Sequence, residues 1–146
     1  MKSIKSAGVI GAGVIGSGWI ARLLLNGIDV FVYDPSKEAQ KNASKVIQNA
    51  ERAYSNLLTS ELPKKGTLLF SNSISEVAKS AQLVIEAVPE RLSAKQSVYE
   101  EIESSTDKNV IIASSTSGIL PSDLQAEMSR PERLIVAHPF NPVYLL

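Results

Sequence analysis

The residue best suited to proton transfer is His138, the only histidine of the 146-residue chain. A lone histidine is more often structural than catalytic. His138, however, directly follows the apolar residues 134–137, and Pro139 restricts the backbone after it, as a positioned proton acceptor requires. Imidazole also titrates near neutral pH. We therefore interpret His138 as a candidate general base.

Four other polar residues could act beside this histidine, and each also has a simpler interpretation. Ser117 ends a hydroxyl-rich segment that propensity alone favours as a polar loop, although its hydroxyl could hold a substrate oxygen. Asn141 belongs to an Asn-Pro pair typical of a turn, and its amide could bind the same oxygen. The sequence pattern does not decide whether Glu90 is a solvated acid at a strand end or a functional residue. It likewise does not decide whether Lys95 is an exposed helix lysine or a functional residue.

The glycine-rich segment 7–18 is typical of a phosphate-binding turn between a strand and a helix. Gly11, Gly13 and Gly16 form the pattern G-x-G-x-x-G after a short apolar run. The first glycine permits a tight turn, the second removes a Cβ that would keep a pyrophosphate off the backbone, and the third lets the helix approach the strand. Amides at the helix N-terminus would then face the phosphates. A glycine turn without a ligand is the alternative.

The context of this turn favours dinucleotide binding. A second predicted strand, residues 29–33, ends at Asp34, close to the spacing of about 20 residues expected for a ribose-binding acid. A carboxylate there would accept hydrogen bonds from the ribose and repel a 2′-phosphate, which predicts NAD rather than NADP. The predicted contacts in this half of the site are Gly11, Gly13, Val14, Ile15, Gly16 and Asp34.

Strands and helices alternate along the chain. Apolar runs predict further strands at 68–70, 83–88, 110–113 and 134–137. Sequence patterns predict a helix after the glycine turn that carries residues 19–25, helices at 36–58 and 74–79, and helices that begin near residues 93 and 121. Ser73 with Glu76, and Ser93 with Gln96, match capping boxes. The right-handed crossover rule then predicts an α/β fold, a doubly wound parallel sheet of the Rossmann type. Ligands are expected at the carboxyl ends of its strands.

Composition and charge exclude several classes of function. Basic and acidic side chains balance at 15 each and 44% of the residues are hydrophobic, which argues against disorder and against a nucleic-acid partner. Cysteine is absent, so disulfides and cysteine-ligated metal are excluded, and we expect no metal site. No apolar run approaches the roughly 20 residues of a membrane span, and no targeting pattern is evident. We expect a cytoplasmic chain without membrane association.

Four motifs together resemble the 3-hydroxyacyl-CoA dehydrogenase superfamily of NAD-dependent enzymes. They are Gly-Ala-Gly-Val-Ile-Gly at 11–16, Glu-Ala-Val-Pro-Glu at 86–90, Ser-Ser-Thr-Ser at 114–117 and Ala-His-Pro-Phe-Asn-Pro at 137–142. The resemblance implies that His138 is the catalytic base and that Ser117 and Asn141 bind the reacting oxygen. It also implies that Glu90, Lys95 and Ser115 contact the cofactor.

Within the superfamily, segments 89–92, 115–118 and 138–146 look most like the L-carnitine dehydrogenase branch. That resemblance implies oxidation of the 3-hydroxy group of L-carnitine to 3-dehydrocarnitine. The acyl-CoA enzymes usually carry asparagine where this chain has Ser115, and the region 41–66 is short for their helical hairpin. A 3-hydroxyacyl-CoA dehydrogenase, an L-gulonate 3-dehydrogenase and a noncatalytic NAD-binding module are the alternatives.

The resemblance also implies a longer protein. In the family, the histidine pairs with a glutamate a few residues beyond position 146, and a helical substrate and dimerisation domain follows. We therefore expect residues 1–146 to be the NAD-binding domain of a homodimeric enzyme, able to bind NAD but inactive alone. We also expect the apolar residues 143–146 to be exposed, because the chain stops there without a cap or a polar tail.

Overall fold

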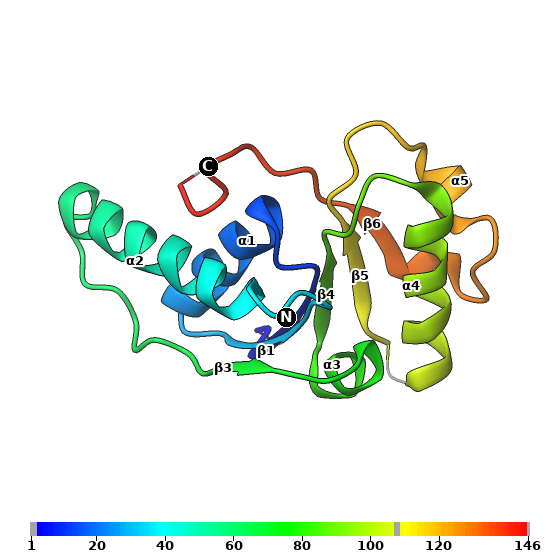
Figure 1. Cartoon of the computed structure of the whole chain (residues 1–146), viewed down its shortest axis with the longest axis horizontal. Helices are drawn as coiled ribbons and strands as arrows, with labels where there is room; N and C mark the ends of the chain where they lie inside the picture. Colours follow the sequence, from blue (N-terminus) through cyan, green and yellow to red (C-terminus); the bar gives the residue numbers. More distant parts are fainter. Residues whose placement is uncertain (1–2, 107–108, 146) are drawn as a thin grey trace.

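A parallel sheet with helices on both faces forms the core of the chain (Figure 1). The computed structural model describes residues 3–106 and 109–145. The strands are β1 (Ser6–Ile10), β2 (Asp29–Tyr33), β3 (Leu68–Phe70), β4 (Leu83–Glu86), β5 (Ile111–Ser114) and β6 (Leu134–Val136). The helices are α1 (Val14–Leu25), α2 (Ala39–Leu57), α3 (Ile74–Ser80), α4 (Leu92–Ser105), α5 (Pro121–Gln125) and the 3-10 helix η1 (Pro131–Arg133).

The strand order is β3-β2-β1-β4-β5-β6, and every neighbouring pair is parallel. This order is that of a doubly wound dinucleotide-binding sheet, so the predicted fold class is confirmed. No helix within the described residues is long and apolar enough to cross a membrane.

Alternate residues of the central strand face two separate apolar layers. Val9 of β1 packs in the layer that contains α1 and α2, whereas its neighbour Ile10 packs in the layer that contains α3 and α4. Figure 1 shows α1 and α2 on one side of the strands and α4 on the other. The near-continuous apolar runs of the strands follow from this burial on both faces.

The register aligns the carboxyl ends of four strands. Ile10 of β1 lies beside Glu86 of β4, Glu86 lies beside Ser114 of β5, and Ser114 lies beside Val136 of β6. The loops that follow these strands therefore begin side by side at one edge of the sheet. These loops contain the glycine turn, Glu90, Ser117 and His138.

Strand β4 ends two residues earlier than predicted. The predicted strand ran to Val88, but the ladder stops at Glu86. The amide of Val88 donates to Glu86 Oε1 at 3.0 Å, so this amide turns back toward the strand end instead of extending the sheet. The segment from Ala87 to Glu90 thereby becomes part of the loop edge.

Helix α2 is amphipathic, as the sequence predicted, but it begins at Ala39 rather than at residue 36. Its buried residues follow one another at intervals of three or four along one face. They are Ala39, Ala43, Ile47, Ala50 and Tyr54.

The first of the two predicted capping boxes forms only in part. Ser73 Oγ accepts a hydrogen bond from the amide of Glu76 at 3.2 Å, as the pattern predicts. The carboxylate of Glu76, however, accepts from the amide of Asn72 at 2.9 Å instead of from that of Ser73.

The second predicted capping box, Ser93 with Gln96, is wrong. Helix α4 begins earlier, at Leu92, with Arg91 as its N-cap and no side chain capping it. The amide of Lys95 bonds to the carbonyl of Arg91 at 3.1 Å, which places Ser93 inside the first turn.

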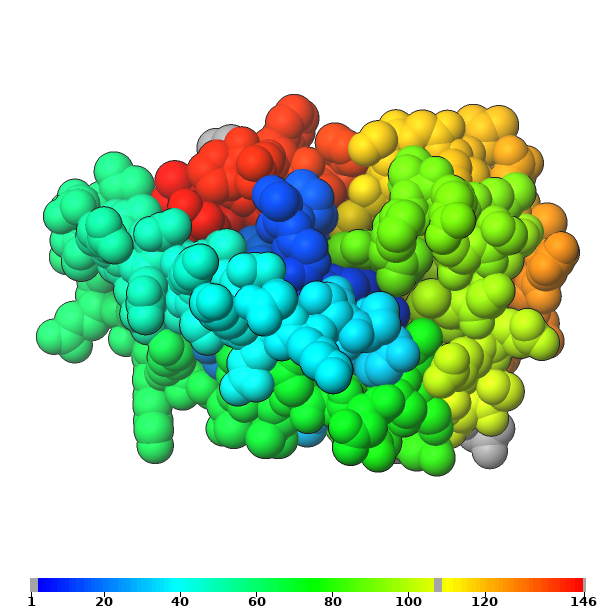
Figure 2. Space-filling view, in the orientation of Figure 1, coloured from blue at the N-terminus to red at the C-terminus, as the bar shows by residue number. Residues whose placement is uncertain are grey.

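Val143, near the end of the described chain, packs back onto the domain, contrary to our expectation of an exposed tail, whereas Leu145 is exposed as expected. Val143 is only 1% exposed and lies against Gly18 of α1, where a Cβ would stand 2.7 Å from the Val143 Cβ. The hydroxyl of Tyr54 in α2 donates to the carbonyl of Tyr144. Figure 2 shows this tail, in red, seated against α1, in blue. Leu146 lies outside the described residues.

Candidate active site

A hollow of about 630 Å³ opens at the carboxyl ends of β1, β2 and β4. The residues of the glycine turn and of the end of β2 form one wall, and residues of the β4–α4 loop and of α4 form the other. The first wall contains Gly11, Gly13, Val14, Ile15, Tyr33 and Asp34. This position, outside the strand ends of a doubly wound sheet, is where such folds bind nucleotides.

Each of the three glycines meets a different steric requirement. Gly11 has a φ of +91°, and a Cβ there would stand 2.6 Å from the carbonyl oxygen of Ala87. A Cβ on Gly16 would stand 1.8 Å from the carbonyl oxygen of Gly11, so the helix could not approach the turn. Gly13 differs, because a Cβ there would have no protein atom within 4 Å. The space at Gly13 therefore belongs to the hollow, as the phosphate-binding interpretation requires.

Asp34 both borders the hollow and supports the glycine turn. Its Oδ2 accepts a hydrogen bond from the amide of Ala12 at 2.6 Å, and its Oδ1 accepts from the amide of Ser36 at 2.7 Å. The contact with Ala12 joins residues 22 positions apart, and the sequence pattern did not predict it. Asp34 therefore holds the turn in place while its half-buried carboxylate faces the hollow.

The donor set of this hollow fits a dinucleotide. Its open glycine wall would receive a pyrophosphate on backbone amides, and Asp34 would receive a ribose. Ser115 follows β5 and lies outside the lining of the hollow, and its buried Oγ has no hydrogen-bond partner among the described residues. A buried hydroxyl without a partner is unusual in folded proteins and fits a site that a polar ligand completes.

The structure brings Ser117 and His138 together. Ser117 Oγ and His138 Nε2 lie 3.1 Å apart, and both residues are exposed on the loops after β5 and β6. These loops run together because the amide of Ala137 donates to the carbonyl of Ser114 at 2.9 Å. A hydroxyl within hydrogen-bond distance of an exposed imidazole can hold a substrate oxygen while the imidazole takes a proton.

Asn141 lies on the same loop as His138, three positions further along, and is also exposed. It precedes the cis peptide bond to Pro142. Within the described residues it makes no hydrogen bond with Ser117 or His138. Its predicted contact with the substrate therefore stays a prediction.

Glu90 ties the β4–α4 loop to the loop after β5. Its Oε1 accepts hydrogen bonds from Thr116 Oγ1 at 2.5 Å and from the amides of Ser117 and Gly118 at 2.9 and 3.2 Å. Lys95 Nζ lies 3.2 Å from its other oxygen. Burial raises the pKa of Glu90, but these four contacts outweigh burial and lower the pKa to about 2. The carboxylate is thus ionised at neutral pH, and it is not merely a solvated acid at a strand end.

Lys95 is not an exposed helix lysine, since its side chain is only 1% exposed. Its ammonium lies 2.7 Å from Oε1 of Glu86, a residue with a fully buried side chain. The other oxygen of Glu86 accepts from Tyr99 Oη at 2.7 Å and from Ser114 Oγ at 2.6 Å. Burial, together with the charge of Glu86, raises the pKa of Tyr99 well above its usual range, so this hydroxyl stays protonated. Direct contact of Lys95 with a cofactor stays a prediction.

Glu86 and Tyr99 are the residues at this edge that sequence reasoning missed. The available signal was Glu86 itself, the one charged side chain in the apolar run 83–88. A charge in a strand buried on both faces needs partners nearby, and Lys95 and Tyr99 lie on the helix that covers this strand end.

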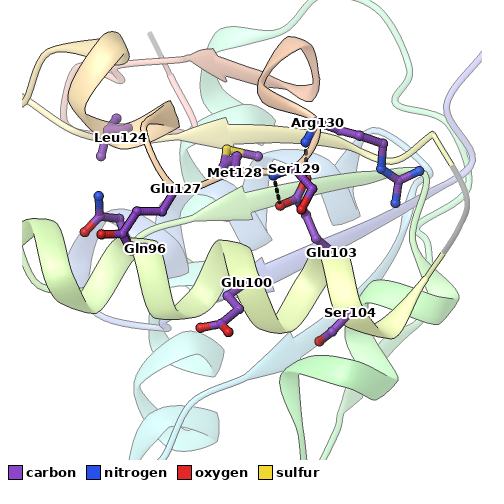
Figure 3. A pocket seen from close by; sticks show the side chains of 9 residues that line it. All are labelled: Gln96, Glu100, Glu103, Ser104, Leu124, Glu127, Met128, Ser129 and Arg130. Atoms are coloured by element: carbon purple, nitrogen blue, oxygen red, sulfur yellow. Dashed lines mark hydrogen bonds between the residues drawn. The ribbon is translucent and has the colours of Figure 1, made fainter.

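A second hollow, of about 360 Å³, lies between α4 and residues 124–130 (Figure 3). Glu103 binds the amides of Ser129 and Arg130 at 2.9 and 2.8 Å, so its carboxylate connects the helix to this segment. Figure 3 shows Glu100 pointing away from that pair. No group of three metal-ligating side chains occurs in the described part of the chain. This hollow contains none of the predicted site residues.

Fold and site together define a dinucleotide-binding domain of the dehydrogenase type. The family model described as "3-hydroxyacyl-CoA dehydrogenase, NAD binding domain" matches residues 6–146. The chain therefore belongs to this family, and its cofactor is NAD.

The chain is also similar to individual proteins of known name. It is 52% identical to an L-carnitine dehydrogenase of Mesorhizobium japonicum over 147 residues, covering 100% of this chain and 40% of that relative. It is 49% identical to the L-carnitine dehydrogenase of Oceanobacillus iheyensis, covering 98% of this chain and 47% of that relative. A solved 5-formyl-3-hydroxy-2-methylpyridine 4-carboxylic acid 5-dehydrogenase superposes with a TM-score of 0.86 at 38% identity, covering 97% of this chain and 46% of its own. The chain thus spans less than half the length of these proteins.

Proposed function

We propose that this chain is the cofactor-binding domain of an enzyme that oxidises the 3-hydroxy group of L-carnitine to 3-dehydrocarnitine with NAD+. The observation that carries the proposal is the Ser117–His138 pair, 3.1 Å apart at the same sheet edge as the dinucleotide hollow. The identity of about half of all residues to proteins named L-carnitine dehydrogenase supports the choice of substrate.

In this reaction the chain's own residues bind, orient and deprotonate the alcohol. His138 Nε2 accepts the proton of the substrate hydroxyl, and Ser117 Oγ donates a hydrogen bond to the oxygen as it becomes a carbonyl. Asn141 supplies a second hydrogen bond to this oxygen. Bound NAD+ supplies the hydride acceptor.

The glycine turn, Asp34 and the loops after β4 and β5 would contact different parts of the cofactor. The amides at Gly13, Val14 and Ile15 receive the pyrophosphate, with Gly11 and Gly16 shaping the turn. Asp34 receives the adenosine ribose. Glu90 and Ser115 lie on the loops after β4 and β5, near the Ser117–His138 pair, and contact the nicotinamide half.

We further propose that the complete protein is a cytoplasmic homodimer in which a helical domain follows this one. The similar dehydrogenases are more than twice as long as the matched region, which supports the additional domain. By family resemblance, that domain would provide the glutamate that pairs with His138, so turnover requires the full-length product of the gene.

The test is a substrate panel on the full-length protein, with NADH formation measured by absorbance. L-Carnitine should be oxidised in preference to 3-hydroxybutyryl-CoA and L-gulonate, and His138→Asn should lower kcat by roughly 10²- to 10⁴-fold. Glu100→Gln, an exposed acid on α4, is the control and should leave kcat unchanged. Turnover of the CoA ester alone would refute the carnitine assignment. NAD binding without turnover of any 3-hydroxy acid would favour a noncatalytic module.

A further inference from the structure

One buried lysine connects the apolar interior to the candidate active site. Lys95 Nζ lies 2.7 Å from Glu86 and 3.2 Å from Glu90. The side chain of Glu86 is 0% exposed and that of Glu90 is 44% exposed. A single cation therefore joins an acid sealed inside the protein to an acid on the loop edge.

The inner end of this connection is rigid. Besides Lys95, Glu86 accepts hydrogen bonds from the amide of Val88 at 3.0 Å, from Tyr99 Oη at 2.7 Å and from Ser114 Oγ at 2.6 Å. These donors come from the β4–α4 loop, from α4 and from β5. The carboxylate is held from three elements, and its position is determined by the fold.

The outer end of the connection reaches the reacting groups. Glu90 Oε1 accepts hydrogen bonds from the amides of Ser117 and Gly118 and from the hydroxyl of Thr116. Its Oε2 lies beside the Lys95 ammonium. Ser117 in turn lies 3.1 Å from His138 through its side chain. The contacts run without interruption from Glu86 through Lys95 and Glu90 to the Ser117–His138 pair.

We propose that Glu86 and Lys95 are positioning residues for this pair. Glu86 fixes the Lys95 ammonium, and the ammonium holds the Glu90 carboxylate against the amides of Ser117 and Gly118. The loop is thereby kept where Ser117 Oγ meets His138. The consequence for turnover rests on the proposed function, whereas the positioning itself does not.

Stability alone does not account for the ion pair. The cost of desolvating two buried charges offsets most of their attraction, and apolar side chains of similar volume often pack as well. Apolar replacements would, however, leave Glu90 Oε2 without its cation. The Glu86–Lys95 pair therefore differs from apolar side chains of similar volume in one respect, namely that its ammonium fixes the position of the Glu90 carboxylate.

Two variants separate positioning from packing. Lys95→Met removes the cation and leaves Glu86 as a buried charge without a counterion. The double variant Glu86→Gln with Lys95→Met removes both charges. In the double variant, the amide nitrogen of the glutamine can donate to the Tyr99 and Ser114 hydroxyl oxygens, so both contacts persist with donor and acceptor exchanged.

Three measurements on the 146-residue chain report the outcome. Thermal unfolding reports stability. Amide hydrogen exchange at Ser117 and Gly118 reports the hydrogen bonds from these amides to Glu90, and the ring NMR signals of His138 report its contact with Ser117. The ring signals are unambiguous because the chain has one histidine. Glu100→Gln is the matched control on the same helix, and it should change none of the three.

Lys95→Met should lower the unfolding temperature, speed exchange at Ser117 and Gly118 by about tenfold or more, and shift the His138 ring signals. The double variant should regain most of the unfolding temperature, because no unpaired charge remains buried. Exchange at the two amides should nevertheless stay fast, and the ring signals should stay shifted. In the full-length protein, kcat should fall about 10- to 100-fold.

Recovery of slow exchange together with stability in the double variant would overturn the proposal, since the pair would then act only in packing. If Lys95→Met does not fold, Glu90→Gln breaks the same connection from its exposed end. Exchange at Ser117 and Gly118 that is unchanged in Glu90→Gln would equally refute it. If the full-length wild type does not oxidise carnitine, the proposed function fails, but exchange and ring signals still decide the positioning.

Discussion

Replacing Asp34 by asparagine tests whether one side chain both supports the glycine turn and selects the cofactor. The carboxylate accepts two backbone hydrogen bonds, from Ala12 at 2.6 Å and from Ser36 at 2.7 Å. Asparagine has one accepting oxygen and one donating nitrogen, so it can keep only one of these amides satisfied. The variant therefore loses one charge-assisted bond in the turn and one acceptor for the ribose.

The magnitude follows from these contacts. A hydrogen bond to a charged group contributes about 1.5 to 3 kcal/mol, and Asp34 is half-buried, so the lower end of that range applies. Each 1.4 kcal/mol is about a tenfold change in an equilibrium constant. Loss of the turn contact alone should raise the Kd for NAD about tenfold, and loss of the ribose contact as well should raise it up to about 100-fold.

Calorimetric titration of the chain with NAD and with NADP measures both effects. The wild type should bind NAD more tightly than NADP, and Asp34→Asn should narrow that preference because the charge that repels a 2′-phosphate is gone. Glu38→Gln, an exposed acid close by, is the control and should bind both cofactors as the wild type does. Tighter binding of NADP than NAD by the wild type, or an unchanged Kd for NAD in Asp34→Asn, would refute the reasoning.

Three further predictions concern the glycines and Glu90. Gly13→Val should abolish NAD binding while the chain stays folded, because a Cβ there meets only open space and the poorer N-cap of α1 costs only about 0.5–2 kcal/mol; unfolding of this variant would contradict the assignment. Gly18→Val should expose the tail to proteolysis while NAD binding persists, since its Cβ would stand 2.7 Å from that of Val143; an unchanged digestion pattern would count against the packing described. The contacts of Glu90 lower its pKa from 4.5 to about 2, so the stability they contribute is present above pH 4.5 and lost as the pH falls toward 2. The free energy of unfolding, measured against pH, should fall by about 1–2 kcal/mol over this range, a value already lowered because Glu90 is partly exposed. This pH dependence should be absent in Glu90→Gln.

The amino-acid sequence by itself determined the fold class and the position of the glycine turn in the candidate dinucleotide site. Strands β2 and β3 have the predicted bounds, and the glycine turn leads from β1 into α1 as expected. These features depend on local patterns, namely apolar runs, glycine spacing and the distance to Asp34. Local patterns can be read along the chain because neighbouring residues alone produce them. The handedness rule for crossovers then converts alternating elements into a sheet order.

The helix starts show where local patterns were insufficient. Ser93 and Gln96 have the spacing of a capping box, yet α4 begins at Leu92. A cap is worth about 1 kcal/mol, and packing that involves several residues outweighs it. In α4 the buried residues Lys95 and Tyr99 both bond to Glu86, so the rotation and start of the helix follow from those contacts.

Only the tertiary structure decided which charges meet. The sequence left Glu90 and Lys95 open between a solvated surface and a functional site, and it did not distinguish Glu86 from any other interruption of a strand. The contact from Glu90 to Ser117 spans 27 positions, and that from Ser114 to Glu86 spans 28. The burial of Val143 against Gly18 likewise joins opposite ends of the chain. Such contacts depend on strand register and on how helices pack over strand ends, which no local window of sequence contains. The pKa of Glu90 is therefore a property of the folded edge of the sheet, where four donors converge on one carboxylate.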